Sequence, residues 1–278
     1  MNKTKIEWAD STWNPVTGCY HDCAYCYARG TARWFSGCDN PPNGADSLQV
    51  IDLKERLTVT DGKGKTRNAM YPFGFKPTLH EYRLGDPIRR GFGETIFVCS
   101  MADLFGEWVP DEWIEKVFDA CKAAAGHRYL FLTKNPARYI KLAQAGKLPA
   151  GDEFRYGSTT TGPDVEAFWA DTHKTFVSIE PLLEPFGARE SGLITLKTGW
   201  AIIGAETGNR KDKVTPKAEW VAEIVDSFHS AGKPVFMKDS LIPIVGESGM
   251  VREFPWSAEK PGTGHWAGHF RNRFERVE

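Results

Sequence analysis

Three cysteines crowd into a short stretch near the start of the chain. Cys19, Cys23 and Cys26 have the spacing C-x3-C-x2-C. Three thiolates on one loop can bind three corners of a [4Fe-4S] cubane, whereas an electron-transfer cluster normally takes four cysteines. The remaining iron would keep an open position for a ligand from outside the protein. The spacing therefore predicts an iron-sulfur cluster that binds a second molecule.

A structural zinc site is the alternative interpretation of the same residues, with His21 as a fourth ligand. A zinc site usually takes a second ligand pair at finger-like spacing, and no second C-x2-C or H-x3-H pair follows in the sequence. A non-catalytic iron-sulfur or zinc protein that serves a partner by binding thus stays open as another functional class. It leaves the polar groups described below unexplained.

The composition of the chain indicates the compartment and the kinds of partner to expect. The 35 Lys and Arg residues nearly balance the 36 Asp and Glu residues, so charge alone demands no polyanionic partner. The six cysteines are too sparse for a disulfide scaffold and suit a reducing compartment. The first residues lack the apolar core of a signal peptide, and no window approaches the roughly 18 apolar residues of a membrane span. We expect a soluble, cytoplasmic protein without a membrane partner.

Short apolar runs alternate with helical patterns along the chain, which is typical of repeated βα units and a parallel sheet. The predicted strands are Ile6–Trp8, Thr95–Cys99, Tyr129–Leu132, Arg155–Thr159, Thr175–Ile179, Trp200–Ile203 and Pro234–Met237. The predicted helices are Asp111–Ala125, Pro136–Ala145 and Pro216–Ala231.

Two irregular segments interrupt this rhythm. Residues 37–93, between the first helix and the second strand, read as an insertion with a hairpin turn at Asp61–Gly64, and residues 246–278 read as an irregular C-terminal tail. The sequence as a whole predicts a single α/β domain over 1–278, a partial or full (β/α) barrel. In such folds chemistry lies at the carboxyl ends of the strands.

Several motifs accompany the cysteines in a characteristic order. They are Ile6–Trp8, Thr12–Cys19, Ser100–Phe105, Leu132–Lys134, Ser178–Leu183 and Gly204–Gly208. Together they resemble the phage Gp37/Gp68 family (DUF5131) of radical S-adenosylmethionine (SAM)-like proteins, across nearly the whole chain except the insertion and the tail. The stretch Cys23–Tyr27 is also locally similar to spore photoproduct lyase, a radical SAM enzyme that acts on thymine dimers in DNA.

The resemblance implies a barrel of the radical SAM type, with SAM on the open iron. In that superfamily an aromatic residue near the adenine occupies the position of Tyr25. Many members hold the SAM amino group with a Gly-Gly-Glu motif, and here Ser100 and Asp103 stand in that place. A carboxylate facing an ammonium is a sensible replacement, because charge-assisted hydrogen bonds are strong. The alternative is that Asp103 caps the following turn.

Polar residues at other strand ends complete the predicted cofactor site. Lys134 would pair with the SAM carboxylate or a substrate anion, or would be a solvated surface residue. Ser158 and Thr160 would face the SAM ribose, with Thr159 and Thr161 pointing away because side chains alternate along a strand.

Two carboxylates belong to the same expectation. Glu180 would face the pocket, or instead form a salt bridge to Lys134 or Lys238 that ties neighbouring strands. Glu206, in a glycine turn, would contact SAM.

The substrate is the part that the sequence defines least. Candidate contacts are Lys238, Asp239, His269 and Arg271. We expect a radical SAM enzyme that modifies or rearranges a nucleobase in phage DNA, in an infected or prophage-bearing cell, with a flavodoxin or ferredoxin as electron donor. A free nucleotide, amino acid or small metabolite is the competing substrate class, which the near-neutral charge of the chain would suit.

Overall fold

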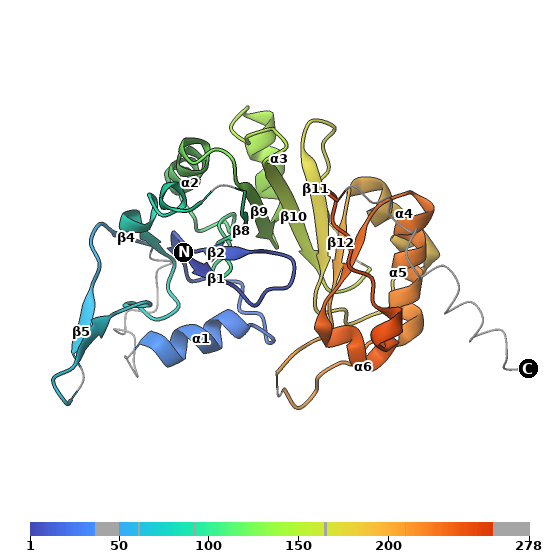
Figure 1. Cartoon of the computed structure of the whole chain (residues 1–278), viewed down its shortest axis with the longest axis horizontal. Coiled ribbons are helices and arrows are strands. Elements are labelled where there is room, and N and C mark those ends of the chain that lie inside the picture. The colour runs from blue at the N-terminus through green and yellow to red at the C-terminus, as the bar shows by residue number, and fades with distance from the viewer. Residues whose placement is uncertain (37–49, 61, 92, 164–165, 209, 258–278) are drawn as a thin grey trace, which may run out of the picture. The chain divides into compact units, whose positions relative to one another are not determined.

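The computed structural model describes residues 1–36, 50–60, 62–91, 93–163, 166–208 and 210–257 (Figure 1). The chain divides into two compact units, which we call the N-terminal unit (Met1–Phe154) and the C-terminal unit (Arg155–Glu278). The predicted contacts His269 and Arg271 lie outside the described residues.

The strands of the main sheet lie side by side in the order in which they occur in the sequence. They are, in spatial order, β1 (Asn2–Lys3), β2 (Ser11–Trp13), β8 (Thr95–Val98), β9 (Arg128–Thr133), β10 (Phe154–Thr160), β11 (Lys174–Ile179), β12 (Ala201–Ile203) and β13 (Val235–Met237). β1 pairs antiparallel with β2, and each later pair within a unit is parallel. Parallel strands that follow one another in chain order, with helices between them, define a partial (β/α) barrel. This confirms the predicted fold class.

Helices lie between most of the parallel strands; the described residues between β10 and β11 contain none, and the last short helix follows β13. The helices are α1 (Tyr27–Ser36), α2 (Asp111–Ala123), α3 (Pro136–Gln144), α4 (Gly187–Lys197), α5 (Ala218–Ser230) and α6 (Ile242–Val245), with 3-10 turns η1 (Glu81–Arg83), η2 (Pro87–Arg89), η3 (Asp239–Leu241) and η4 (Glu247–Gly249). The three predicted helices are confirmed as α2, α3 and α5. None of the helices in the described ranges is long and apolar enough to cross a membrane.

Each unit has its own packed core. In the N-terminal unit the ring of Phe118 on α2 lies 5.4 Å from that of Phe131 on β9. In the C-terminal unit α4 and α5 cover one face of β11 to β13, where Val177 and Val235 pack among the helix side chains. The strands are therefore fixed by helices on that face, and the carboxyl ends of the strands are left to loops.

The predicted first strand is wrong. Residues 6–8 form a turn, in which the Ala9 N–H donates to the Ile6 carbonyl at 3.2 Å, and the strand beside β8 is β2. Trp8 is nevertheless buried and lies 4.6 Å from Phe97, ring to ring. Its apolar character marked a core contact, which a turn can supply as well as a strand. The other six predicted strands are confirmed with boundary shifts of a residue or two.

The described part of the insertion contains regular structure. β5 (Thr58–Thr60) and β6 (Thr66–Asn68) pair antiparallel, which confirms the predicted hairpin. β4 (Ile51–Leu53) and β7 (Thr78–His80) form a second small sheet with β3 (Val16–Thr17). Because β3 leads directly into the cysteine loop, the insertion supports the base of that loop.

Candidate functional site

The three cysteines lie on the loop that joins β3 to α1, which we call the cysteine loop (residues 18–26). Its entry is set by Gly18, whose φ of +88° is a conformation that favours glycine. A Cβ atom on Gly18 would lie 2.2 Å from the carbonyl oxygen of Lys76. The Gly18 N–H donates to Met101 at 2.9 Å, and the Cys19 N–H donates to Phe75 at 3.2 Å. The backbone therefore threads between two other segments just before the first cysteine.

The thiols of the cysteine loop are close enough to affect one another. The pKa of Cys19 is raised to about 12, chiefly by burial and also by the nearby charges of Asp103 and the other two cysteines, against the opposing effect of a backbone hydrogen bond from His21. Burial also raises the pKa of Cys23, against the opposing effect of Lys134. The protein alone thus keeps the thiols of Cys19 and Cys23 protonated at neutral pH. A bound metal centre would supply the positive charge that thiolates need, so the donor set fits an iron-sulfur cluster.

A single-ion site has different requirements. In the described part of the chain, no three His, Cys, Asp or Glu side chains are arranged to hold one metal ion. A zinc ion needs its ligands to converge on one point, whereas the thiolates of a cubane each bind a different iron. The finding therefore applies to a site for a single zinc ion and does not test a site for a four-iron cluster.

Asp103 is a buried carboxylate with four hydrogen-bond donors around it. Its Oδ1 accepts from the Phe105 N–H at 3.0 Å and the Thr133 hydroxyl at 2.7 Å. Its Oδ2 accepts from the Lys134 N–H at 2.9 Å and lies 2.7 Å from Nε2 of His21. The bond to Phe105 is the turn cap that the sequence left as the alternative. These contacts already satisfy the carboxylate, so the SAM ammonium would have to displace one of them.

Lys134 and Tyr25, both predicted to meet SAM, contact each other. The Lys134 Nζ donates to the Tyr25 hydroxyl at 3.1 Å and lies 5.2 Å from the ring centroid. Lys134 is thus not a solvated surface residue. Its ammonium has two further protons, which it can donate to another acceptor while it binds Tyr25.

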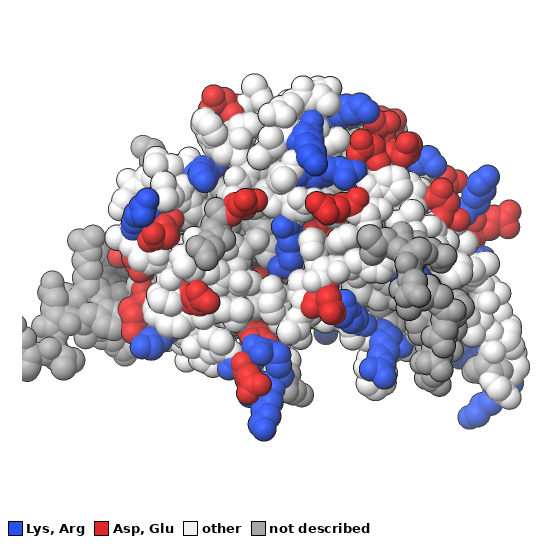
Figure 2. Space-filling view, turned by 180° about the vertical axis from the view of Figure 1, so that it is seen from behind, with Lys and Arg blue, Asp and Glu red and all other residues white. Residues whose placement is uncertain are grey.

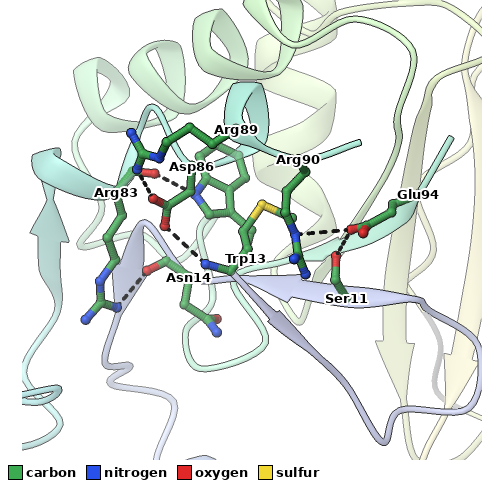
Figure 3. A network of polar contacts seen from close by, with 9 residues as sticks. Ser11, Trp13, Asn14, Arg83, Asp86, Arg89, Arg90 and Glu94 are labelled. Atoms are coloured by element: carbon green, nitrogen blue, oxygen red, sulfur yellow. Dashed lines mark hydrogen bonds and ion pairs between the residues drawn. The ribbon is translucent and has the colours of Figure 1, made fainter. Parts of the chain in front are cut away.

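Ser100 is held by its neighbours in the N-terminal unit. Its hydroxyl donates to Oδ1 of Asn14 at 3.2 Å, and the Met101 N–H donates to the same oxygen at 3.0 Å. Asn14 is fixed in turn by Arg83, whose guanidinium donates to the backbone carbonyl of Asn14 at 3.0 Å (Figure 3). The backbone carbonyl of Arg83 accepts a hydrogen bond from the Trp13 indole at 2.9 Å. This network secures the end of β2 against the turn that follows β8.

Sequence reasoning treated His21 only as a zinc ligand and missed its contact with Asp103. The His21 ring also packs edge-on against Trp108, with ring centroids 4.9 Å apart. The signal available in the sequence was the placement of a histidine between two cysteines. Its partner, far along the chain, has no local sequence signal.

In the C-terminal unit, the side-chain directions of β10 differ from the prediction. Ser158 pairs in register with Val177, which belongs to the helix-covered core. Thr159 pairs with Ser178 and so shares the opposite face. Ser158 and Thr160 therefore lie on the helix-covered side, and the predicted orientation is wrong.

The hydrogen bonds of these residues agree with that placement. The Ser158 hydroxyl accepts from the Phe168 N–H at 2.9 Å, and the Thr160 hydroxyl donates to the Gly162 carbonyl at 2.8 Å. Thr159 is the partly exposed residue of the three, and the sequence analysis had assigned it no role. Because both faces of β10 are largely buried, alternation of polar and apolar residues gave no signal.

Glu180, at the end of β11, forms an ion pair with Lys238, at the end of β13. This is the alternative that the sequence left open for Glu180. Lys238 N–H also donates to the Ile203 carbonyl at 2.9 Å, which holds the lysine against β12. Both side chains are partly exposed, at 26% for Glu180 and 18% for Lys238, so the pair remains within reach of a ligand.

The other predicted carboxylates of this unit also have cationic partners. Glu206 is buried and receives two bonds from Arg210, from Nε at 2.6 Å and from Nη2 at 2.8 Å. These bonds and the nearby positive charge lower the pKa of Glu206. Asp239 pairs with Arg252 at the surface. The roles predicted for these residues toward SAM or substrate stay predictions.

The fold and the cysteine loop together define an α/β protein with a partial (β/α) barrel and a C-x3-C-x2-C motif ahead of its first long helix. A family model described as "Protein of unknown function (DUF5131)" matches residues 3–241. The chain belongs to this family, which confirms the resemblance drawn from the motifs.

Other comparisons add little detail. None of the curated proteins matches the chain. A solved structure described as "Spore photoproduct lyase complexed with dinucleoside spore photoproduct" is similar to it, with 12% identity and a TM-score of 0.42. The match covers 82% of this chain and 63% of that chain, so this protein spans less than two thirds of the length of that structure.

Proposed function

We propose that this protein is a radical SAM enzyme, with Cys19, Cys23 and Cys26 as the ligands of a [4Fe-4S] cluster. The observation that carries the proposal is the cysteine loop itself: three thiols at C-x3-C-x2-C spacing on one loop, near enough for their charges to affect one another's pKa. Held by these three cysteines, such a cluster would leave one iron open for SAM and would pass on one electron from an external donor, of the flavodoxin or ferredoxin type, for the cleavage of SAM into methionine and a 5'-deoxyadenosyl radical.

The residues around the loop would then bind SAM and hold the loop in place. Lys134 keeps protons to donate to the SAM carboxylate or another anion while its contact with Tyr25 persists. Asp103 and Ser100 hold the loop and the turn beside it. The raised pKa of Cys19 means that cluster assembly must displace its proton.

A reconstitution experiment tests the proposal. The full chain, loaded anaerobically with iron and sulfide and reduced with dithionite in the presence of SAM, should form 5'-deoxyadenosine and methionine, measured by mass spectrometry. Cys23→Ala, treated identically, should form neither. Stoichiometric zinc in place of iron, with no cluster, would overturn the proposal in favour of a zinc-binding protein.

For the substrate we propose a nucleobase in DNA, with a free nucleotide, amino acid or small metabolite as the competing class. Among the described residues drawn in Figure 2, Lys and Arg side chains stand beside Asp and Glu side chains. The near balance of 35 Lys and Arg residues against 36 Asp and Glu residues suits the free nucleotide or another small molecule, because a protein that neutralises several phosphates usually shows a basic patch. Titration of duplex DNA at two salt concentrations separates the two: affinity that falls steeply with salt supports DNA, and unchanged weak binding supports the nucleotide.

A further inference from the structure

We infer that Asp103 and Lys134 are positioning residues, which hold the cysteine loop in the geometry that a cluster needs by acting through His21 and Tyr25. This inference rests on the proposed function of the loop. It gives Asp103 a role toward the cysteines in place of the contact with SAM that the sequence suggested, and it adds such a role to the one proposed above for Lys134.

The contacts of His21 with Asp103 and of Tyr25 with Lys134 lie in different intervals of the cysteine loop. His21 lies between Cys19 and Cys23, and Tyr25 lies between Cys23 and Cys26. Each interval between neighbouring cysteines therefore carries at least one side chain that is tied to residues outside the loop. In the first interval, Tyr20 also packs on Trp108 and Asp22 also pairs with Arg29. No helix or strand occurs in this described stretch between β3 and α1, so side-chain contacts must contribute to its shape.

The two anchors are joined to each other at the end of β9. Oδ2 of Asp103 lies 2.7 Å from His21 Nε2 and accepts the Lys134 N–H at 2.9 Å. The Lys134 side chain then reaches the Tyr25 hydroxyl at 3.1 Å. A rigid strand end thus controls both intervals of the loop at once.

Burial makes the Asp103 contact effective. Asp103 is 6% exposed, and its four contacts are worth more there than in water, because the surrounding medium is less polar. Partners of this kind around a metal site fix the ligand orientation and tune the metal, and their loss typically costs about 10- to 100-fold in affinity or activity.

The test is best made on the loop side of each contact. Replacing Asp103 would leave the Thr133 hydroxyl and two backbone N–H groups without their acceptor, and could unfold the unit for reasons unrelated to the loop. His21→Phe keeps a ring to pack on Trp108 but removes the polar contact, and His21→Gln keeps an N–H donor. Tyr25→Phe removes the hydroxyl and keeps the ring beneath Lys134.

Each variant is reconstituted as the full chain, and three quantities are measured: the rate at which a chelator removes iron, the EPR spectrum of the reduced cluster, and the thermal midpoint of the apoprotein. We expect His21→Phe and Tyr25→Phe to lose iron about tenfold faster and to shift the EPR spectrum. His21→Phe should also lower the apoprotein midpoint modestly, because the buried Asp103 loses a donor, whereas Tyr25→Phe should leave the midpoint nearly unchanged. His21→Gln should restore most of the wild-type behaviour.

Two outcomes overturn the inference, and they are distinguishable. If the wild type binds a cluster and both phenylalanine variants match it in iron loss and spectrum, the positioning role is wrong while the proposed function stands. If the wild type takes up no cluster at all, the proposed function fails and this inference fails with it.

Discussion

The Glu180 carboxylate and the Lys238 ammonium pair with each other across Gly204, although β12 separates their strands. A Cβ atom on Gly204 would lie 3.1 Å from Cγ and Cδ of Glu180. The absence of a side chain at this one position is what lets the carboxylate lie over β12 and meet the lysine.

Gly204→Ala should therefore destabilise the protein by about 1–3 kcal/mol, because Glu180 has to give way in a crowded position. Gly192→Ala in α4 is the matched control: its added Cβ meets nothing within 4 Å, and alanine favours a helix by up to about 1 kcal/mol. Urea unfolding of both variants measures the difference. Equal stability of the two would show that Gly204 has no spatial role.

Replacing any one of Cys19, Cys23 and Cys26 with alanine should abolish the [4Fe-4S] absorption and EPR signals, since each thiolate holds a different iron. Cys121→Ala is the control, because this cysteine is a buried residue of α2 and lies outside the loop. It should keep a full cluster at a modest cost in stability. A full cluster in any of the three loop variants would remove that residue from the ligand set.

Gly18→Ala should prevent the cysteine loop from forming. The substitution combines a φ of +88° with a Cβ placed 2.2 Å from backbone, so the cost should exceed about 2 kcal/mol. Gly30→Ala in α1, where an added Cβ meets nothing within 4 Å, should be neutral or stabilising. Circular dichroism melting and iron content after reconstitution report the two effects. A Gly18 variant that melts and loads iron like the wild type would contradict this reading of the loop entry.

Acid should destabilise the N-terminal unit through His80. Burial, with a smaller contribution from Arg83, lowers the pKa of His80 to about 3. The unfolded chain takes up the proton near pH 6.5, so between pH 6.5 and about 3 it binds one proton more than the folded chain, and stability falls as the pH falls. The slope from this residue is about 1.4 kcal/mol per pH unit.

His80→Gln removes the titrating group. It should be less stable than the wild type at pH 8, because the buried ring contacts Thr17 at 2.8 Å and Tyr82 at 3.2 Å. Between pH 6 and 4 its urea midpoint should nevertheless decline less steeply. Parallel pH profiles for the two proteins would mean that His80 is not responsible for the acid sensitivity.

The elements of the fold were largely predictable, for reasons visible in particular segments. Strands such as β11 are short runs of apolar and β-branched residues, and α2 begins after Pro110 with Asp111 and Glu112 in its first turn, a favourable arrangement at a helix start. α4 was missed because Gly187 and Gly192 weaken its helical pattern.

Local chemistry was determined by the sequence alone. The spacing of Cys19, Cys23 and Cys26, the glycine ahead of them and the family motifs are all properties of neighbouring residues, and they predicted the site and the family without coordinates.

Only the tertiary structure decided the partners of the carboxylates. Asp103 lies beside His21 and Glu180 beside Lys238, and these pairs are separated by 82 and 58 residues along the chain. A sequence indicates that a carboxylate in apolar surroundings needs a partner, but not which one. That choice depends on strand register and on which face of a strand a side chain occupies. Both are set when distant segments pack, which is why Ser158 and Thr159 exchanged their predicted directions.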